Sequence, residues 1–223
     1  MTTFDERTIR CFCCDTASSH HILRSTNRMG SADLDQRPPE MMRSTMGAWL
    51  QECPSCGYVA KDLCKGDAGE RQFVNSEAYQ ALRTGPHASL LSCRFLLAAA
   101  LARFRNDREQ AFYHTLSAAW IADDSGKLDL AREWRRQAAD HVLSEGGTPD
   151  LRLRLLDVLR RCGAWDDAGL LAAEMTAEPL EYPMPRIVRF QLGKISERDV
   201  NCYSVEDALA GPDTAEPDDR LTA

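Results

Sequence analysis

Long apolar runs are missing from this 223-residue chain, and no stretch approaches the roughly 20 consecutive apolar residues that span a bilayer. The first ten residues, MTTFDERTIR, also lack the apolar run of a secretory signal. We therefore expect a soluble, cytoplasmic protein without membrane contact, in which cysteine thiols stay reduced.

Recognisable catalytic motifs are absent as well. His87, His114 and His141 do not have the spacing of a His-Glu-x-x-His motif, and neither Gly-x-Ser-x-Gly nor a phosphate-binding loop occurs. Because the sequence offers no candidate nucleophile, we expect that the protein is not an enzyme.

An excess of positive charge is also lacking, since the net charge is -7. Residues 1–70 carry 8 basic and 10 acidic groups, residues 71–195 carry 17 and 16, and residues 196–223 carry 2 and 8. Most of the negative charge therefore lies at the C-terminal end. Residues 211–223 are rich in proline and acid, which predicts disorder. A near-neutral body is not typical of nonspecific nucleic-acid binding, which relies on clustered Lys and Arg.

Cysteine, in contrast, is abundant, with nine residues. Cys11 with Cys14, and Cys53 with Cys56, have the Cys-x-x-Cys spacing that lets a tight turn aim both sulfurs at one ion. Four thiolates close a tetrahedral zinc shell and leave no open position for a substrate. We therefore predict one structural Zn²⁺ bound by these four cysteines. A redox dithiol is the alternative interpretation.

The segment around the paired cysteines predicts a small zinc-ribbon-like β domain over residues 1–66. Apolar stretches at 47–50 and 58–60 flank the second pair, so we expect one strand to enter the Cys53–Gly57 turn and another to leave it. A head of this size buries only about 60% of its unfolded surface. Structural zinc contributes roughly 10 to 16 kcal/mol of apparent binding free energy, so we expect the head to depend on the metal.

Residues 67–196 form the predicted helical domain. A charged linker at 65–71 opens it, and helical periodicity follows the linker. We expect helices at about 90–102, 107–123, 128–143, 150–162 and 166–175, and a last one around 187–195. Residues 197–223 are then a C-terminal extension, mostly a disordered acidic tail.

Within the helices, small residues recur at offsets that predict two tetratricopeptide-like hairpins. The first hairpin is marked by Phe95, Ala99, Ala111 and Ala118. The second is marked by Leu156 and Ala168 and is less complete, because Met175 replaces the last small residue. The 57 residues from Ala111 to Ala168 exceed a regular repeat of about 34, so an extra helix around Trp134 is expected between them. The predicted fold class is mainly α, a zinc-ribbon-like β head followed by a tetratricopeptide-like helical hairpin stack.

Several other residues carry alternative interpretations. His20, His21 and Cys64 are possible replacements for one of the four ligands, although surface histidines and a buried thiol are the commoner roles. Asp33, Asp35 and Arg37 lie between the cysteine pairs, where they can bind a partner or form turns and salt bridges. The helical arginines form either a basic stripe for nucleic acid or solvated helix faces: Arg103, Arg105, Arg108, Arg132, Arg135, Arg136, Arg152, Arg154, Arg160 and Arg161.

The stretch WLQECPSCGYVA at 49–60, the earlier Cys-x-x-Cys and the AAWIAD segment at 118–123 resemble an uncharacterised bacterial family of cytosolic proteins. That family, a domain of unknown function, joins a zinc-ribbon-like head to tetratricopeptide-like helices, and the resemblance covers roughly residues 10 to 205. It implies zinc at Cys11, Cys14, Cys53 and Cys56. Phe12 and Cys13 stand where the family has proline and another residue, so Cys13 is an alternative to Cys14.

The functional hypothesis from the sequence is a non-enzymatic adaptor, in which zinc stabilises the head and the helical stack binds a protein or peptide. A nucleic-acid-binding regulator is the alternative, and a thiol-based redox sensor using Cys13 or Cys14 is a weaker one. The partner, the oligomeric state and the presence of a pocket between head and stack stay open at this stage.

Overall fold

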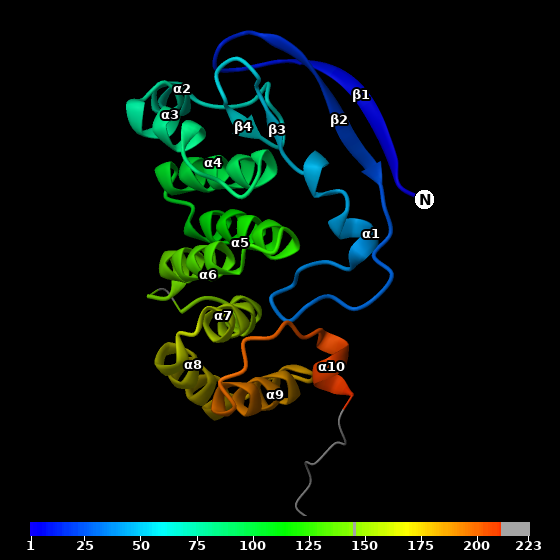
Figure 1. Ribbon diagram of the computed structural model, residues 1–223, viewed down its shortest axis with the longest axis vertical. Helices are drawn as coiled ribbons and strands as arrows, with labels where there is room; N and C mark the ends of the chain where they lie inside the picture. Colours follow the sequence, from blue (N-terminus) through cyan, green and yellow to red (C-terminus); the bar gives the residue numbers. More distant parts are fainter. Residues whose placement is uncertain (145, 211–223) are drawn as a thin grey trace, which may run out of the picture.

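The computed structural model describes residues 1–144 and 146–210, and Figure 1 shows a β-rich head above a stack of helices. The expected fold class, mainly helical with a small N-terminal β head and packed helix pairs, is confirmed. The elements follow one another in the order β1 (Thr3–Arg10), β2 (Ala17–Ser25), α1 (Glu40–Arg43), η1 (Met46–Ala48), β3 (Gln51–Glu52), β4 (Val59–Ala60), α2 (Ala68–Val74), α3 (Glu77–Thr84), α4 (Leu90–Phe104), α5 (Arg108–Asp124), α6 (Leu128–Val142), α7 (Pro149–Cys162), α8 (Trp165–Ala177), α9 (Met184–Ser196) and α10 (Val205–Leu209).

The head contains two antiparallel hairpins. In the short one, Gln51 pairs with Ala60 and Glu52 with Val59, which confirms the expected strands on either side of the second cysteine pair. The longer β1–β2 hairpin surrounds the first pair and was not expected. Most of its side chains are exposed on both faces, so the alternation of apolar and polar residues that marks a half-buried strand is missing.

The expected helices are all present, and the extra helix around Trp134 is α6. Local signals set their ends. Thr148 caps the first turn of α7 by accepting a hydrogen bond from the Leu151 amide, Pro149 follows it, and Gly163 ends the helix in the left-handed region at φ 79°.

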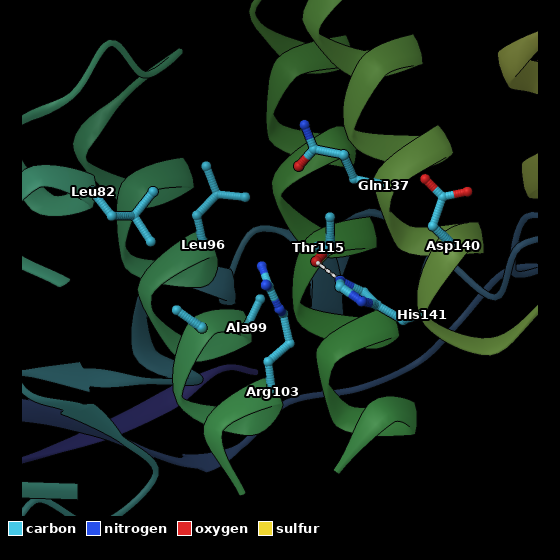
Figure 2. A pocket seen from close by; sticks show the side chains of 9 residues that line it. Leu82, Leu96, Ala99, Arg103, Thr115, Gln137, Asp140 and His141 are labelled. Atoms are coloured by element: carbon cyan, nitrogen blue, oxygen red, sulfur yellow. Dashed lines mark hydrogen bonds between the residues drawn. The ribbon is translucent and has the colours of Figure 1, made fainter. Parts of the chain in front are cut away.

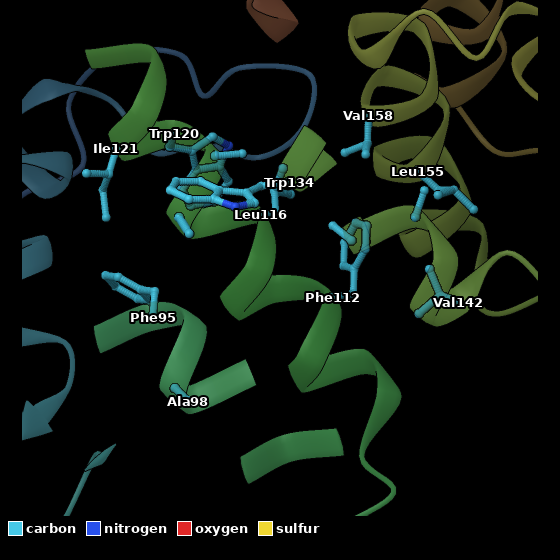
Figure 3. Packing of buried hydrophobic residues seen from close by; sticks show 14 of the residues in the cluster. Phe95, Ala98, Phe112, Leu116, Trp120, Ile121, Trp134, Val142, Leu155 and Val158 are labelled. Atoms are coloured by element: carbon cyan, nitrogen blue, oxygen red, sulfur yellow. The ribbon is translucent and has the colours of Figure 1, made fainter. Parts of the chain in front are cut away.

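The core of the stack crosses α4, α5, α6 and α7 (Figure 3). Large side chains such as Phe112 and Leu116 on α5 are fully buried there, and Trp134 on α6 is 5% exposed. Ala111 and Ala118 of α5 are also fully buried, and such short side chains let neighbouring helices approach closely. The tetratricopeptide-like character of these helix pairs stays a prediction.

The expected linker at 65–71 is partly helical, because α2 begins at Ala68. The Asp67 side chain accepts a hydrogen bond from the Glu70 amide, and the Glu70 side chain accepts one from the Asp67 amide. This capping box starts a helix within a charged, glycine-containing segment that periodicity alone reads as a linker.

Residues 26–50, which we call the insert, leave the head and run beside the helical stack (Figure 1). At its far end the insert meets the C-terminal segment, where the Leu34 amide donates to the Tyr203 carbonyl and the Val205 amide to the Ala32 carbonyl. Leu34 is 2% exposed and belongs to the same hydrophobic core as the helices. The proposed division at residues 66 and 196 stays a prediction.

Residues 211–223, for which disorder is predicted, lie outside the described residues. Across residues 1–144 and 146–210, no helix combines the length and apolar character required to cross a bilayer.

Candidate metal centre

The two Cys-x-x-Cys pairs converge on one point of the head. Cys11 and Cys14 lie in the turn between β1 and β2, and Cys53 and Cys56 lie in the turn between β3 and β4. Their four Sγ atoms all lie within 4.8 Å of one another. Cys11 Sγ is 3.7 Å from Cys56 Sγ, and Cys14 Sγ is 3.5 Å from Cys53 Sγ.

The two turns repeat one hydrogen-bond pattern. The Cys11 carbonyl accepts from the Asp15 amide and the Cys53 carbonyl accepts from the Gly57 amide, both at 2.9 Å. The residue after each second cysteine has positive φ, 62° at Asp15 and 77° at Gly57. Each turn therefore uses one left-handed residue to bring its two sulfurs together, which only glycine and a few polar residues do at low cost.

The first cysteine of each turn also donates its amide to the residue that directly precedes the strand leaving the turn. Cys11 N lies 2.9 Å from the Thr16 carbonyl oxygen, and Cys53 N lies 2.9 Å from that of Tyr58. The turns are thus tied at both ends, which restricts the directions that the thiols can take.

The sulfur geometry fits a zinc ion. A tetrahedral shell with Zn–S bonds of about 2.3 Å has sulfurs about 3.8 Å apart, close to the observed 3.5 and 3.7 Å. An all-thiolate donor set selects soft metals, and zinc is the common structural one. Cys11 and Cys53 are buried and Cys14 is exposed, so the centre lies at the edge of the core with one side toward solvent.

The thiols differ in acidity. Burial raises the pKa of Cys11 and of Cys56. Burial acts the same way on Cys14, but its hydrogen bonds with Thr16 and with neighbouring thiols outweigh burial and lower its pKa to about 6.

Side chains of helix α3 donate hydrogen bonds to the backbone of the second turn. Tyr79 Oη donates to the Gly57 carbonyl at 2.9 Å, and Gln80 Nε2 donates to the Cys56 carbonyl at 3.0 Å. Arg83 covers Gly57 so closely that a Cβ there would lie 2.6 Å from Arg83 Cδ. These contacts fix the second pair of thiols relative to the helical stack, as outer partners do at metal sites.

Helix α2 holds the first turn. Arg71 donates to the Phe12 carbonyl at 2.6 Å, and its guanidinium lies 4.8 Å from the centre of the Phe12 ring. Sequence reasoning missed Arg71 and the α3 residues Tyr79, Gln80 and Arg83, because nothing in a helix indicates a distant partner. The one feature of the sequence that could have indicated these contacts is that the polar residues recur at helical spacing on short helices that follow the head.

The alternative ligands lie outside the cluster. Within the part of the chain that the structure describes, the sulfur cluster contains the four paired cysteines alone. Cys13 is half-buried, and burial raises its pKa to about 12. Cys64 is exposed and lies 2.8 Å from an Asp62 oxygen, and His20 on β2 lies 2.7 Å from Ser18 Oγ. His21, exposed on the same strand, lines a separate groove beside η1.

Asp35 and Arg37, two of the three insert residues considered for partner binding, form contacts within the chain. Asp35 is fully buried and accepts from the Trp120 indole at 2.8 Å and from Arg161 at 3.2 Å. It also accepts from the Arg37 amide at 3.1 Å, as in a turn, and Arg37 pairs with Asp124. Turn and salt-bridge chemistry therefore accounts for Asp35 and Arg37, as one of the two interpretations expected. The Asp33 amide donates to the Arg37 carbonyl at 3.0 Å, so Asp33 is part of the same turn.

Neither interpretation of the helical arginines fits all ten. Arg135 is 1% exposed, Arg160 is fully buried and Arg161 is 7% exposed. Arg135 and Arg161 both pair with Asp123, at 2.5 and 3.0 Å. For these three, both a solvated face and a basic stripe are wrong, because a buried guanidinium reaches neither solvent nor a phosphate.

Comparisons with family models, with curated proteins and with solved structures find no match for this chain. The chain is therefore described by its structure, which is a two-hairpin head with a four-cysteine cluster followed by a helical stack.

Proposed function

We propose that the chain is a non-enzymatic, cytoplasmic zinc-binding adaptor, in which zinc stabilises the head and the helical stack binds a protein partner. The observation that carries the proposal is the convergence of Cys11, Cys14, Cys53 and Cys56 within 4.8 Å. Four thiolates fill a tetrahedral shell, so no position is open for a reactive water or a substrate.

The partner surface that we propose lies on the side of the stack shown in Figure 2, where α3, α4, α5 and α6 surround a cavity of about 290 Å³. Leu82 and Leu96 give it an apolar wall, and Arg103, Gln137 and Asp140 offer polar groups at its rim. An apolar cavity with a few polar groups suits an extended peptide or a protruding side chain.

Thr115 and His141 also line this cavity and contact each other. His141 Nε2 lies 3.3 Å from Thr115 Oγ1 across the gap between α6 and α5. Burial, and then the positive charge of Arg103, lower the pKa of His141, which favours the neutral imidazole. The cavity therefore offers a neutral imidazole beside the Arg103 guanidinium, which suits a carboxylate or a polar side chain.

Site-specific photo-crosslinking tests the partner surface. A benzophenone amino acid at Gln137, which lines the cavity, is compared with one at Arg132 on another part of the same helix. We expect a discrete protein crosslink from position 137 and none from 132, unchanged by nuclease. Crosslinks only to nucleic acid, lost at high salt, would support the regulator alternative instead. Identical crosslinks from both positions would contradict the surface.

A further inference from the structure

A second cavity, of about 370 Å³, lies between the insert and the helical stack. Its walls come from residues far apart in the sequence, with Trp49 from the insert and Tyr113 and Trp120 from α5. This volume is within the range of small-molecule sites, which commonly occur where two parts of a fold meet. A cavity between head-derived and stack-derived residues is therefore part of the fold.

Three aromatic side chains line this cavity, and the polar edges of both indoles are already paired. Trp120 Nε1 donates to Asp35 at 2.8 Å, and Trp49 Nε1 donates to Thr45 Oγ1 at 2.9 Å. The indoles therefore need no hydrogen-bond acceptor from a ligand, and what they can offer it is apolar ring surface. Such surfaces favour a flat aromatic ring, by stacking or by edge contact.

Two arginines give the cavity a positive character. Arg28 is exposed on the insert, and Arg154 reaches in from α7 with its guanidinium 5.3 Å from the centre of the Tyr113 ring. Arg154 also donates to the Tyr113 hydroxyl. Over residues 1–144 and 146–210, neither guanidinium has a carboxylate oxygen within 4.0 Å.

The one carboxylate that lines the cavity does not cancel this charge. Asp35 is fully buried and is shared by the Trp120 indole, Arg161 at 3.2 Å and Arg135 at 3.7 Å. Two guanidinium groups beside the aromatic walls therefore keep donors for an anion, and arginine suits the planar oxygens of carboxylate or phosphate.

We propose that this cavity binds a small planar aromatic anion, a flat ring that carries a carboxylate or a phosphate. The ring lies against the aromatic wall of Trp49, Tyr113 and Trp120, and the anionic group binds Arg28 and Arg154. This site is separate from the zinc cluster and from the partner cavity of Figure 2, and it does not depend on the proposed function.

Calorimetric titration of the full zinc-loaded chain tests the site with two matched sets of probes. AMP is compared with adenosine, and indole-3-acetate with indole, so that each anion has a neutral partner with the same ring. Ribose 5-phosphate serves as an anion without a ring. We expect AMP or indole-3-acetate to bind about tenfold or more tightly than its neutral partner, as expected for charge-assisted hydrogen bonds. AMP alone would identify a nucleotide site, and indole-3-acetate alone an aromatic acid site.

Arg28→Gln and Arg154→Gln then separate the site from adventitious binding. Each substitution should weaken the bound anion about tenfold while leaving the neutral ring unchanged. The matched control is Arg152→Gln on the same helix, since Arg152 pairs with Glu178 at 2.6 Å and does not line this cavity. Because Arg28 is exposed, its variant keeps the test valid if Arg154→Gln is destabilised.

Three results would overturn the proposal. They are no binding of either anion at about 1 mM, equal affinity for ribose 5-phosphate and AMP, and unchanged affinity in both arginine variants.

Discussion

The head and the helical stack are stabilised in different ways. The stack has a continuous core in which α5 alone buries Phe112, Leu116 and a row of alanines. The head has a long β1–β2 hairpin with mostly exposed side chains, and its buried residues gather around Cys11, Cys53 and Tyr58. Where a segment is too short to bury enough apolar surface, a metal can supply the missing free energy.

The two regions are nevertheless joined by hydrogen bonds. Tyr58 Oη lies 3.2 Å from the buried Glu70 carboxylate of α2, which also pairs at 2.5 Å with Arg105, the residue that follows α4. Loss of metal should unfold the head, and the stack should lose only the contacts that the head makes with it.

The largest effect is expected from Cys53→Ser, which removes one buried sulfur from the cluster. Structural zinc contributes roughly 10 to 16 kcal/mol of apparent binding free energy, far more than a domain of this size holds in reserve. We expect loss of the metal and rapid proteolysis of residues 1–66, measured by elemental analysis and limited digestion. Cys64→Ser, at an exposed cysteine outside the cluster, should keep both metal and protease resistance. A stable, zinc-loaded Cys53→Ser protein would contradict the account.

The next effect is expected in the stack, from Phe112→Ala. This side chain is fully buried between helices (Figure 3), and its removal should cost about 3 to 5 kcal/mol of unfolding free energy. Urea denaturation followed by circular dichroism measures the loss, and the zinc content of the folded protein should be unchanged. Leu128→Ala, at a side chain that is 61% exposed, should stay within about 0.5 kcal/mol of the wild type.

A somewhat smaller, pH-dependent effect is expected for Asp123→Asn. Burial raises the pKa of Asp123, but the hydrogen bond and charge of Arg135 and the charge of Arg161 outweigh it and hold the pKa below its ordinary value. A depressed pKa stabilises the fold above the unfolded value of about 3.9 and loses this contribution as the pH falls through the folded value. At pH 7 the variant should lose about 3 kcal/mol, because it leaves buried Arg135 without its closest partner.

Urea denaturation of the wild type and of Asp123→Asn at pH 7 and at pH 3 checks the direction in which the stability difference changes with pH. The difference between wild type and Asp123→Asn should shrink at pH 3, which lies below the unfolded pKa of about 3.9, because the unfolded carboxyl then binds a proton and part of the contribution is lost. Acid also removes zinc from both proteins, so the difference between them isolates the ion pair. A difference that grows toward low pH would show that the carboxylate does not stabilise the fold as a charge.

The smallest effect is expected from Tyr79→Phe, which deletes one hydrogen bond between α3 and the second cysteine turn. The loss should be about 1 kcal/mol, with faster transfer of zinc to a chelator because the turn is held less firmly. Stopped-flow chelation measures this rate. Tyr182→Phe, at a residue that is 74% exposed, is the matched control and should transfer zinc at the wild-type rate. Equal rates in both variants would mean that the stack does not hold the metal site.

Much of the fold was predictable from the sequence because its signals are local. The periodicity of α4 to α9, the Pro149 and Gly163 boundaries and the strands around the second cysteine pair all follow from short-range patterns. The convergence of the four cysteines was predictable for a similar reason, since two turns of one geometry satisfy a single ion.

What could not be predicted depends on contacts between distant segments. The path of the insert along the stack rests on Asp35 meeting Trp120 and Arg161, partners 85 and 126 residues away. A charged loop gives no sign that its carboxylate will be buried, because burial depends on guanidinium groups from other helices. The aromatic cavity beside the insert is hidden from the sequence for the same reason.

The most direct test of the central claim is X-ray absorption spectroscopy at the zinc edge on the freshly purified chain, combined with elemental analysis. The account predicts one zinc per chain, surrounded by four sulfurs at about 2.3 Å. Absence of stoichiometric metal, or a shell that contains nitrogen or oxygen in place of sulfur, would contradict it.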